Sequence, residues 1–174
     1  DVPAPSTGAV VATDNCGGTV TITSADVITP GTCANRYTIA RTYTATDVCG
    51  NASSQVQTIT VDDQTAPVIT RIPSSTTVRC AALVPAPNTA AVVATDNCGG
   101  TVTITSADVI TPGTCANRYT IARTYTATDV CGNASSQVQT ITVDDQTAPD
   151  ITSIPADVTV SCVADVPAPN IGAV

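Results

Sequence analysis

The chain contains an 82-residue repeat, and this repeat limits what the chain can fold into more than any other feature of its sequence. Residues 11–67 recur without change as residues 93–149, so the offset is 82 positions. The same offset relates three copies of the motif Val-Pro-Ala-Pro, at residues 2–5, 84–87 and 166–169. A fixed period indicates an array of one structural unit. A unit of 82 residues is too long for a solenoid coil and suits an autonomous sandwich domain.

The composition favours β-strands over helices. Val, Ile, Thr and Tyr suit the pleated, half-buried surface of a sheet, whereas Glu, Lys, Met, Phe, His and Trp are all absent. Alternation with period two, as in residues 101–105, places Val and Ile on one face of a strand and Thr on the other. In the complete repeat, strands are expected at 68–72, 76–80, 90–96, 101–107, 118–129 and 136–143, and turns at 97–100, 112–113 and 131–133. The predicted fold is all-β: tandem, Ig-like, antiparallel β-sandwich domains.

The boundary between repeats is predicted from a polar segment that follows a strand-like run. Residues 62–67, Asp-Asp-Gln-Thr-Ala-Pro, recur as residues 144–149, and the proline stops a strand ladder. Cutting the chain there predicts one complete repeat at 66–148. Residues 1–65 are then a repeat that lacks its first strands, and residues 149–174 are the first strands of a further repeat.

The charge and the residue types exclude several classes of function. The formal net charge of −8 argues against nucleic-acid binding, which depends on Lys and Arg. No apolar run approaches the length of about 20 residues that spans a bilayer, so no membrane insertion is expected. Without His, Lys or Glu, the usual pairs of nucleophile and base cannot be assembled. The protein is therefore not expected to be an enzyme.

Three motifs resemble signatures of HYR-type and bacterial Ig-like domains. Residues 45–51 read Ala-Thr-Asp-Val-Cys-Gly-Asn, similar to the turn between the last two strands of those domains. Residues 61–67 read Val-Asp-Asp-Gln-Thr-Ala-Pro, similar to their junctions, and residues 77–80 stand where the family has an early cysteine-bearing strand. The resemblance implies tandem extracellular domains of bacterial surface adhesins and fibres.

The cysteines are expected to form disulfides. Eight cysteines in a chain without His indicate disulfides rather than zinc, and therefore a secreted or cell-surface location. The strands of an antiparallel sandwich run alternately up and down, so each cysteine belongs to one end of its domain, and a bond requires Cα atoms within about 7 Å. The predicted pairs are Cys80–Cys115, Cys98–Cys131 and, by repetition, Cys16–Cys49. Such staples would stabilise a domain whose core has almost no large side chains.

The two remaining cysteines, Cys33 and Cys162, are expected to pair outside the chain. By repetition, the partner of Cys33 lies before residue 1 and that of Cys162 lies beyond residue 174. Two explanations fit: the chain is a window on a longer polypeptide, or copies join head to tail by strand donation. The third repeat begins without an ending signal, which favours the window. In both cases the expected partners are neighbouring copies or repeats of the same unit, and the product is a linear fibre.

Calcium is the expected cofactor. Aspartates at domain junctions often bind Ca²⁺ in bacterial Ig-like families, and the resemblance extends this expectation to the present chain. The strand directions place Asp96 and Asp129 at the end that receives Asp62 and Asp63. Converging carboxylates repel one another unless a hard cation neutralises them, and Ca²⁺ prefers oxygen ligands. The alternative is that these aspartates suit turns and keep the surface soluble. Half-sites completed from outside the chain are expected at Asp14 with Asp47 and at Asp144 with Asp145.

Glycans are a further candidate. Asn51 and Asn133 each begin the acceptor pattern for N-glycosylation, although a three-residue pattern is weak. Solvent-facing threonines such as Thr19, Thr21 and Thr23 are candidate O-glycan acceptors, but Thr is also an ordinary surface residue of strands.

The predicted function is a structural repeat unit of an extracellular bacterial filament or adhesin stalk, joined end to end. The alternative is an adhesion module that itself binds a glycan or a protein. Recognition surfaces usually carry aromatic and Arg anchors. Here the only aromatic residues are four tyrosines, and the arginines of the long strand are expected to pair with aspartates: Arg36, Arg41, Arg118 and Arg123. The structural role is therefore favoured.

Overall fold

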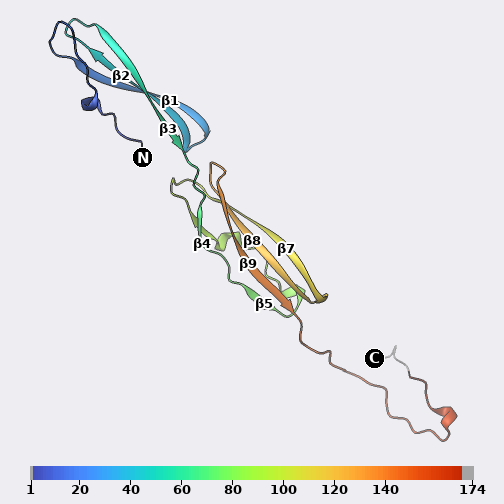
Figure 1. The fold of residues 1–174 in the computed structure, drawn as a ribbon. Helices are drawn as coiled ribbons and strands as arrows, with labels where there is room; N and C mark the ends of the chain where they lie inside the picture. The colour runs from blue at the N-terminus through green and yellow to red at the C-terminus, as the bar shows by residue number, and fades with distance from the viewer. Residues whose placement is uncertain (1, 170–174) are drawn as a thin grey trace.

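A computed structural model describes residues 2–169, which form strands and loops with only short helical turns (Figure 1). The strands are β1 (Thr21–Cys33), β2 (Arg36–Thr46), β3 (Ala52–Asp62), β4 (Val68–Arg71), β5 (Thr76–Val78), β6 (Val93–Thr95), β7 (Thr103–Cys115), β8 (Arg118–Thr128) and β9 (Ala134–Asp144). The 3-10 helices are η1 (Thr7–Ala9), η2 (Ala81–Leu83), η3 (Thr89–Ala91) and η4 (Val163–Asp165). The predicted all-β fold is confirmed. Among residues 2–169, no helix is long and apolar enough to span a membrane.

The C-terminal module, residues 68–144, is a sandwich of two sheets. One sheet has the order β5-β9-β8-β7, and the other pairs β4 with β6. Every pair is antiparallel except β5 with β9, which run parallel. Side chains alternate along β8, so that Tyr125 and Ala127 point into the core, where Ile69 of β4 and Val92 cover them. The small core therefore lies between the two sheets.

The N-terminal module, residues 2–62, is a single antiparallel sheet with the order β1-β2-β3. Its first residues lie against this sheet, since the backbone N–H of Ser6 donates a hydrogen bond to the Tyr43 hydroxyl at 3.3 Å. Within residues 2–169, no strand pairs with the outer edge of β3, the edge that β5 covers on β9 in the C-terminal module. The N-terminal module is thus the C-terminal one without its first strands.

The two modules follow one another along one line, joined by residues 63–67 (Figure 1). Beyond β9 the chain continues to residue 169 with η4 as its one regular element. This stretch belongs to the predicted third repeat, 149–174, of which residues 170–174 lie outside the described residues.

The expected turn at Pro112-Gly113 is wrong, and β7 is longer than predicted. β7 runs on to Cys115, and Pro112 pairs with Tyr119 of β8 just before a register shift between Pro112 and Cys115. The bulge accommodates the proline, which has no N–H for the ladder. A Cβ on Gly113 would lie 2.0 Å from the Arg118 carbonyl oxygen, so this close approach of two backbones requires glycine.

Candidate functional site at the junction between modules

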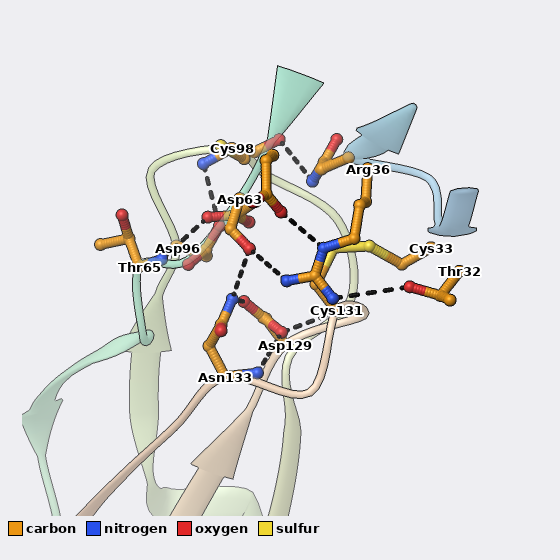
Figure 2. The surroundings of a disulfide bond; sticks show 12 residues. Thr32, Cys33, Arg36, Asp63, Thr65, Asp96, Cys98, Asp129, Cys131 and Asn133 are labelled. Atoms are coloured by element: carbon orange, nitrogen blue, oxygen red, sulfur yellow. Dashed lines mark hydrogen bonds and ion pairs between the residues drawn. A yellow bond between two sulfur atoms is a disulfide. The ribbon is translucent and has the colours of Figure 1, made fainter. Parts of the chain in front are cut away.

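A disulfide ties the two modules together. Cys33 ends β1 of the N-terminal module, and Cys131 lies in the turn between β8 and β9 of the C-terminal module. The two cysteines are 98 positions apart in the sequence, and their Cα atoms are 5.1 Å apart (Figure 2). This distance is within the range of an ordinary disulfide. The junction therefore has two covalent connections, the linker and the disulfide.

Arg36 holds the linker against the hairpin that carries Cys33. Its Nε lies 2.6 Å from Asp62 Oδ1, and its Nη2 donates to the Asp63 carbonyl oxygen at 3.0 Å. The Asp63 N–H in turn donates to the Asn35 carbonyl oxygen at 3.1 Å. Because these bonds come from the tip of the β1–β2 hairpin, they fix the direction in which the chain leaves β3. Asn35 Nδ2 also reaches across the junction to the Cys98 carbonyl oxygen, at 3.4 Å.

Asp129 builds the turn that presents Cys131. Its Oδ1 accepts from the N–H groups of Cys131 and Asn133, at 2.8 and 2.9 Å, and its Oδ2 accepts from Asn133 Nδ2 at 2.8 Å. Desolvation raises the pKa of Asp129, but the hydrogen bonds from Asn133 and Cys131 outweigh it and lower that pKa below its ordinary value. Gly132 supplies a positive φ of 88° in the same turn. The turn is therefore preorganised by groups within residues 129–133.

The structure differs from the cysteine predictions in both modules. Cys131 bonds Cys33 rather than Cys98, so the pair Cys98–Cys131 is wrong, as is the placing of the Cys33 partner outside the chain. The bonds Cys80–Cys115 and Cys16–Cys49 are also not formed, and all of these cysteines are exposed free thiols. The strand registers do place Cys80 and Cys115 at one end of the module, because Val78 lies beside Val143 and Cys115 beside Arg118. The prediction failed because it considered each module alone, whereas the preceding module brings its own cysteine to the junction.

Two of the four predicted calcium ligands meet at this junction. Oxygen atoms of Asp63 and Asp96 and the Cys98 sulfur lie within 4.8 Å of one another. Asp63 is 5% exposed, and its Oδ2 and the Asp96 Oδ1 are buried without a hydrogen-bond partner. Two unpartnered carboxylate oxygens side by side suit a hard cation. The Cys98 sulfur is a poorer ligand for such a cation. Desolvation and the charge of Asp63 raise the pKa of the Cys98 thiol, which favours its protonated form.

The other predicted ligands are engaged elsewhere. Asp62 pairs with Arg36, and both oxygens of Asp129 accept hydrogen bonds from its own turn. In the predicted half-sites, Asp47 caps the equivalent turn of the N-terminal module and Asp144 pairs with Arg118 at 2.8 Å. Asp14 Oδ2 accepts from the Cys16 N–H at 2.9 Å, and Asp145 Oδ1 accepts from the Thr147 N–H at 3.0 Å.

The prediction that the arginines pair with aspartates is confirmed. Arg123 is 3% exposed, and its Nε and Nη2 each lie 2.8 Å from one carboxylate oxygen of Asp108. Its Nη1 donates to the Pro85 carbonyl oxygen, also at 2.8 Å, so the guanidinium ties β8 to the segment before β6. Arg41 makes the same contacts with Asp26 and Pro3 in the N-terminal module. The hydrogen bond from each arginine lowers the pKa of its aspartate.

The two N-glycosylation patterns lie in the Asp47 and Asp129 turns. Asn51 Nδ2 donates to Asp47 Oδ2 at 2.9 Å. Asn133 Nδ2 donates both to Asp129 Oδ2 and to the Asp63 carbonyl oxygen, so both of its N–H bonds are used at the junction. A glycan on Asn133 would remove one of these bonds. The expected O-glycan acceptors Thr19, Thr21 and Thr23 are exposed.

Sequence reasoning missed the hairpin tip as a functional element. Asn35 and Arg36 were not expected at the junction, although both lie within three residues of Cys33. The signal was available in the repeat, because a cysteine can pair with the next unit of an array as well as with its own.

Comparison with known proteins agrees with this architecture. The sequence model of the family described as "HYR-like domain with 4 cysteines" matches residues 1–61 and 68–143, which is one match for each module. Among curated proteins, none matches the sequence. HYR-like domains are extracellular repeat modules of the adhesion type, and the family is not known as one of enzymes. The chain therefore belongs to the family of HYR-like domains with four cysteines.

Proposed function

We propose that the chain is a structural repeat unit of an extracellular bacterial filament or adhesin stalk, in which modules join end to end. The observation that carries this proposal is the bond between Cys33 and Cys131, because it joins consecutive modules rather than the strands of one module. A disulfide at this place restrains one module against the next.

The junction is suited to transmit force and direction. A linker of residues 63–67 alone would leave the modules free to swing about a single tether. The disulfide adds a second tether, and Arg36 binds the linker to the hairpin beside it. Together, the linker, the disulfide and the Arg36 hydrogen bond restrict bending and twisting between the two modules. An array of such units is an extended rod whose length is set by the number of repeats.

Small-angle X-ray scattering on the monomeric chain, with the Cys33–Cys131 bond formed, tests this proposal. The wild type is expected to scatter as an extended, rigid pair of modules, and Cys33→Ser to scatter as a flexible pair with a broader distribution of distances. Cys115→Ser is the matched control, because Cys115 occupies the position of Cys33 in the other repeat and is a free thiol. Identical curves for the wild type and Cys33→Ser would refute the proposed stiffening.

We further propose that Ca²⁺ binds between Asp63 and Asp96 and stiffens the same junction. The two buried, unpartnered oxygens support this proposal. Calorimetric titration with calcium chloride is expected to give a binding signal for the wild type that Asp63→Asn abolishes. Asp145→Asn is the matched control, because Asp145 is the repeat counterpart of Asp63 and is more exposed. Equal heats for the wild type and Asp63→Asn would refute the site.

The alternative function, direct binding of a ligand, has one observation in its favour. A shallow hollow beside the β7–β8 hairpin is lined by Arg118, Tyr119 and Gln146, and an equivalent hollow beside Tyr37 recurs in the N-terminal module. Tyrosine and arginine are typical anchors of recognition surfaces. Binding to a glycan array that Tyr119→Ala together with Tyr37→Ala removes would support this alternative.

A further inference from the structure

The junction between the two modules exists once within the chain, but each of its halves occurs twice. Cys115 occupies in the C-terminal module the position of Cys33, and Cys49 occupies in the N-terminal module the position of Cys131. Both are exposed free thiols. We infer that Cys115 of one copy forms a disulfide with Cys49 of a second copy, so that copies join head to tail through the same junction that joins the modules within one chain. This inference rests on the proposed end-to-end function.

The half of the junction that carries Cys115 has the geometry of its bonded counterpart. Arg118 Nε lies 2.8 Å from Asp144 Oδ1, and Arg118 Nη2 donates to the Asp145 carbonyl oxygen at 3.1 Å. The Asp145 N–H donates to the Asn117 carbonyl oxygen at 3.1 Å, as the Asp63 N–H does to Asn35. The hairpin tip and the start of the linker are therefore already arranged as they are at the formed junction.

The half that carries Cys49 is also preorganised. Asp47 Oδ1 accepts from the N–H groups of Cys49 and Asn51, both at 2.8 Å, which repeats the pattern that Asp129 makes around Cys131. Asp14, Asp47 and Asn51 line a hollow at this end of the module. At the formed junction the equivalent residues receive Asp63. The open surface therefore has the groups that would receive Asp145 of a second copy.

The second copy would also complete the N-terminal module. Residues 151, 154 and 155 of the C-terminal segment repeat Ile69, Ile72 and Pro73, which lie in β4 and directly after it. Ile151 and Ile154 are 67% and 71% exposed, whereas Ile69 is 6% exposed in the core. In the part of the chain that the structure describes, no strand pairs with the outer edge of β3, whereas β5 pairs with the equivalent edge of β9. Segment 150–162 of one copy can therefore occupy on the next copy the place that residues 68–80 occupy in the C-terminal module.

The linkers make the disulfide and the strand exchange compatible. Residues 144–149, which would connect the modules of two copies, are identical to residues 62–67, which connect the modules of one copy. Residues after 162 are not needed, because the acceptor already holds its own residues 2–10 in place. Arg41 Nη1, for instance, donates to the Pro3 carbonyl oxygen at 2.8 Å.

The bond forms by oxidation of two thiols. Each sulfur loses one proton and one electron as the S–S bond forms, and a small-molecule disulfide such as oxidised glutathione takes up both protons and both electrons and becomes two thiols. An extracellular setting maintains such oxidants.

The experiment uses the 174-residue chain with Cys16, Cys80, Cys98 and Cys162 replaced by Ser, so that Cys49 and Cys115 are its only free thiols. Oxidised glutathione is added, and products are separated on non-reducing gels and mapped by mass spectrometry. A ladder of covalent oligomers linked through Cys115–Cys49 is expected. A further Cys49→Ser change, or a further Cys115→Ser change, removes the ladder, and a mixture of these two variants yields dimers only. A map that bonds Cys49 to Cys115 within one copy, or products that stay monomeric, would overturn the inference.

A second variant tests the strand exchange. Ile151→Asp with Ile154→Asp leaves both cysteines in place but removes the apolar contacts of the donated segment, and ladder formation is expected to slow by about tenfold or more. An unchanged rate would overturn the role of this segment. Electron microscopy of the unlinked Cys115→Ser chain separates this inference from the proposed function. Fibres without the bond would preserve the end-to-end function and reject the disulfide as its link, whereas monomers of the Cys115→Ser chain beside fibres of the wild type would support both.

Discussion

The two modules contain the same invariant segment, yet they bury it differently. Tyr125 and Ile141 are fully buried in the C-terminal module, whereas their counterparts Tyr43 and Ile59 in the N-terminal module are only half-buried. The difference cannot come from these residues or from their neighbours in the sequence, because residues 11–67 and 93–149 are identical. It comes from what packs against them.

The partners are residues 68–82, which contribute β4 and β5 and have no counterpart in the N-terminal module among the described residues. Gln139 shows the effect clearly: it is 3% exposed and its Nε2 donates to the Ser74 carbonyl oxygen at 2.7 Å, whereas its counterpart Gln57 is exposed. A repeat of this family thus assembles its core from the invariant segment and from the stretch before it. The folded module therefore begins and ends at other residues than the exactly repeated segment does.

The aspartates of the formed junction also differ in exposure from their counterparts at the two open halves. Asp63 and Asp129, at the formed junction, are 5% and 7% exposed, whereas Asp145 and Asp47 are half-buried. A junction therefore buries carboxylates that an isolated module leaves closer to solvent. Because burying a charge is unfavourable without a partner, the junction needs the disulfide, the Arg36 clamp or a cation to form.

The largest expected effect comes from the junction disulfide. Closing a loop of 98 residues corresponds to about 4–5 kcal/mol in the chain-entropy model. Cys33→Ser is expected to lower the free energy of unfolding of the oxidised, monomeric chain by about that amount, measured by urea denaturation. Cys115→Ser, the same change in the other repeat, is expected to stay within about 0.5 kcal/mol of the wild type. Equal losses for the two variants would show that the formed and the open junction do not differ in their contribution to stability.

The second-largest effect distinguishes the core of the C-terminal module from that of the N-terminal module. Tyr125→Ala is expected to destabilise the C-terminal module by about 3–5 kcal/mol, because it empties a fully buried site, and Tyr43→Ala to cost about 1 kcal/mol. Denaturation followed by hydrogen-exchange mass spectrometry assigns each loss to a module. Similar losses at both positions would mean that the N-terminal module packs its tyrosine without the missing strands.

A smaller effect is expected for the hydrogen bond that the Gln139 side chain donates to the Ser74 carbonyl oxygen. Gln139→Ala is expected to cost about 1–3 kcal/mol, because the Ser74 carbonyl oxygen loses its donor. Gln57→Ala is expected to change the urea midpoint little, since the Gln57 side chain is exposed. A matching drop for Gln57→Ala would indicate that its amide has a partner in solution.

The smallest difference between the modules is expected in how their stability falls at low pH, because each module contains an equivalent pair of arginine and aspartate. The hydrogen bonds from Arg41 and Arg123 lower the pKa of Asp26 and Asp108 below the ordinary value of 3.8. The stability that these pairs contribute is therefore complete above pH 3.8 and is lost as the pH falls through the lowered pKa. Urea midpoints measured between pH 5 and pH 2 should fall more for the wild type than for Asp26→Asn or Asp108→Asn. Strongly unequal slopes for these two variants would contradict the equivalence of the two pairs.

Much of the fold could be predicted, because it depends on local patterns. Alternation of Val, Ile and Thr identified the long strands, and β8 at Arg118–Thr128 differs by one residue from the expected 118–129. The bulge at Pro112-Gly113 could not be predicted, because proline and glycine are typical of turns and of bulges alike. At the site, Asp63 and Asp96 were expected to meet, and they do. Arg36 was expected to pair with an aspartate, but its choice of Asp62 could not be predicted, since it depends on how the hairpin tip lies against the linker.

The repeat, the all-β class and the pairing of arginines with aspartates could be read from the amino-acid sequence, because each follows from periodicity, propensity or opposite charge in residues that strand pairing brings together. Which cysteines bond could be learned only from the three-dimensional arrangement of the modules. That choice depends on distances across a junction, and no pattern within one repeat contains the position of the next. Cys33 and Cys131 lie within bonding distance because the linker places one module directly on the end of the other.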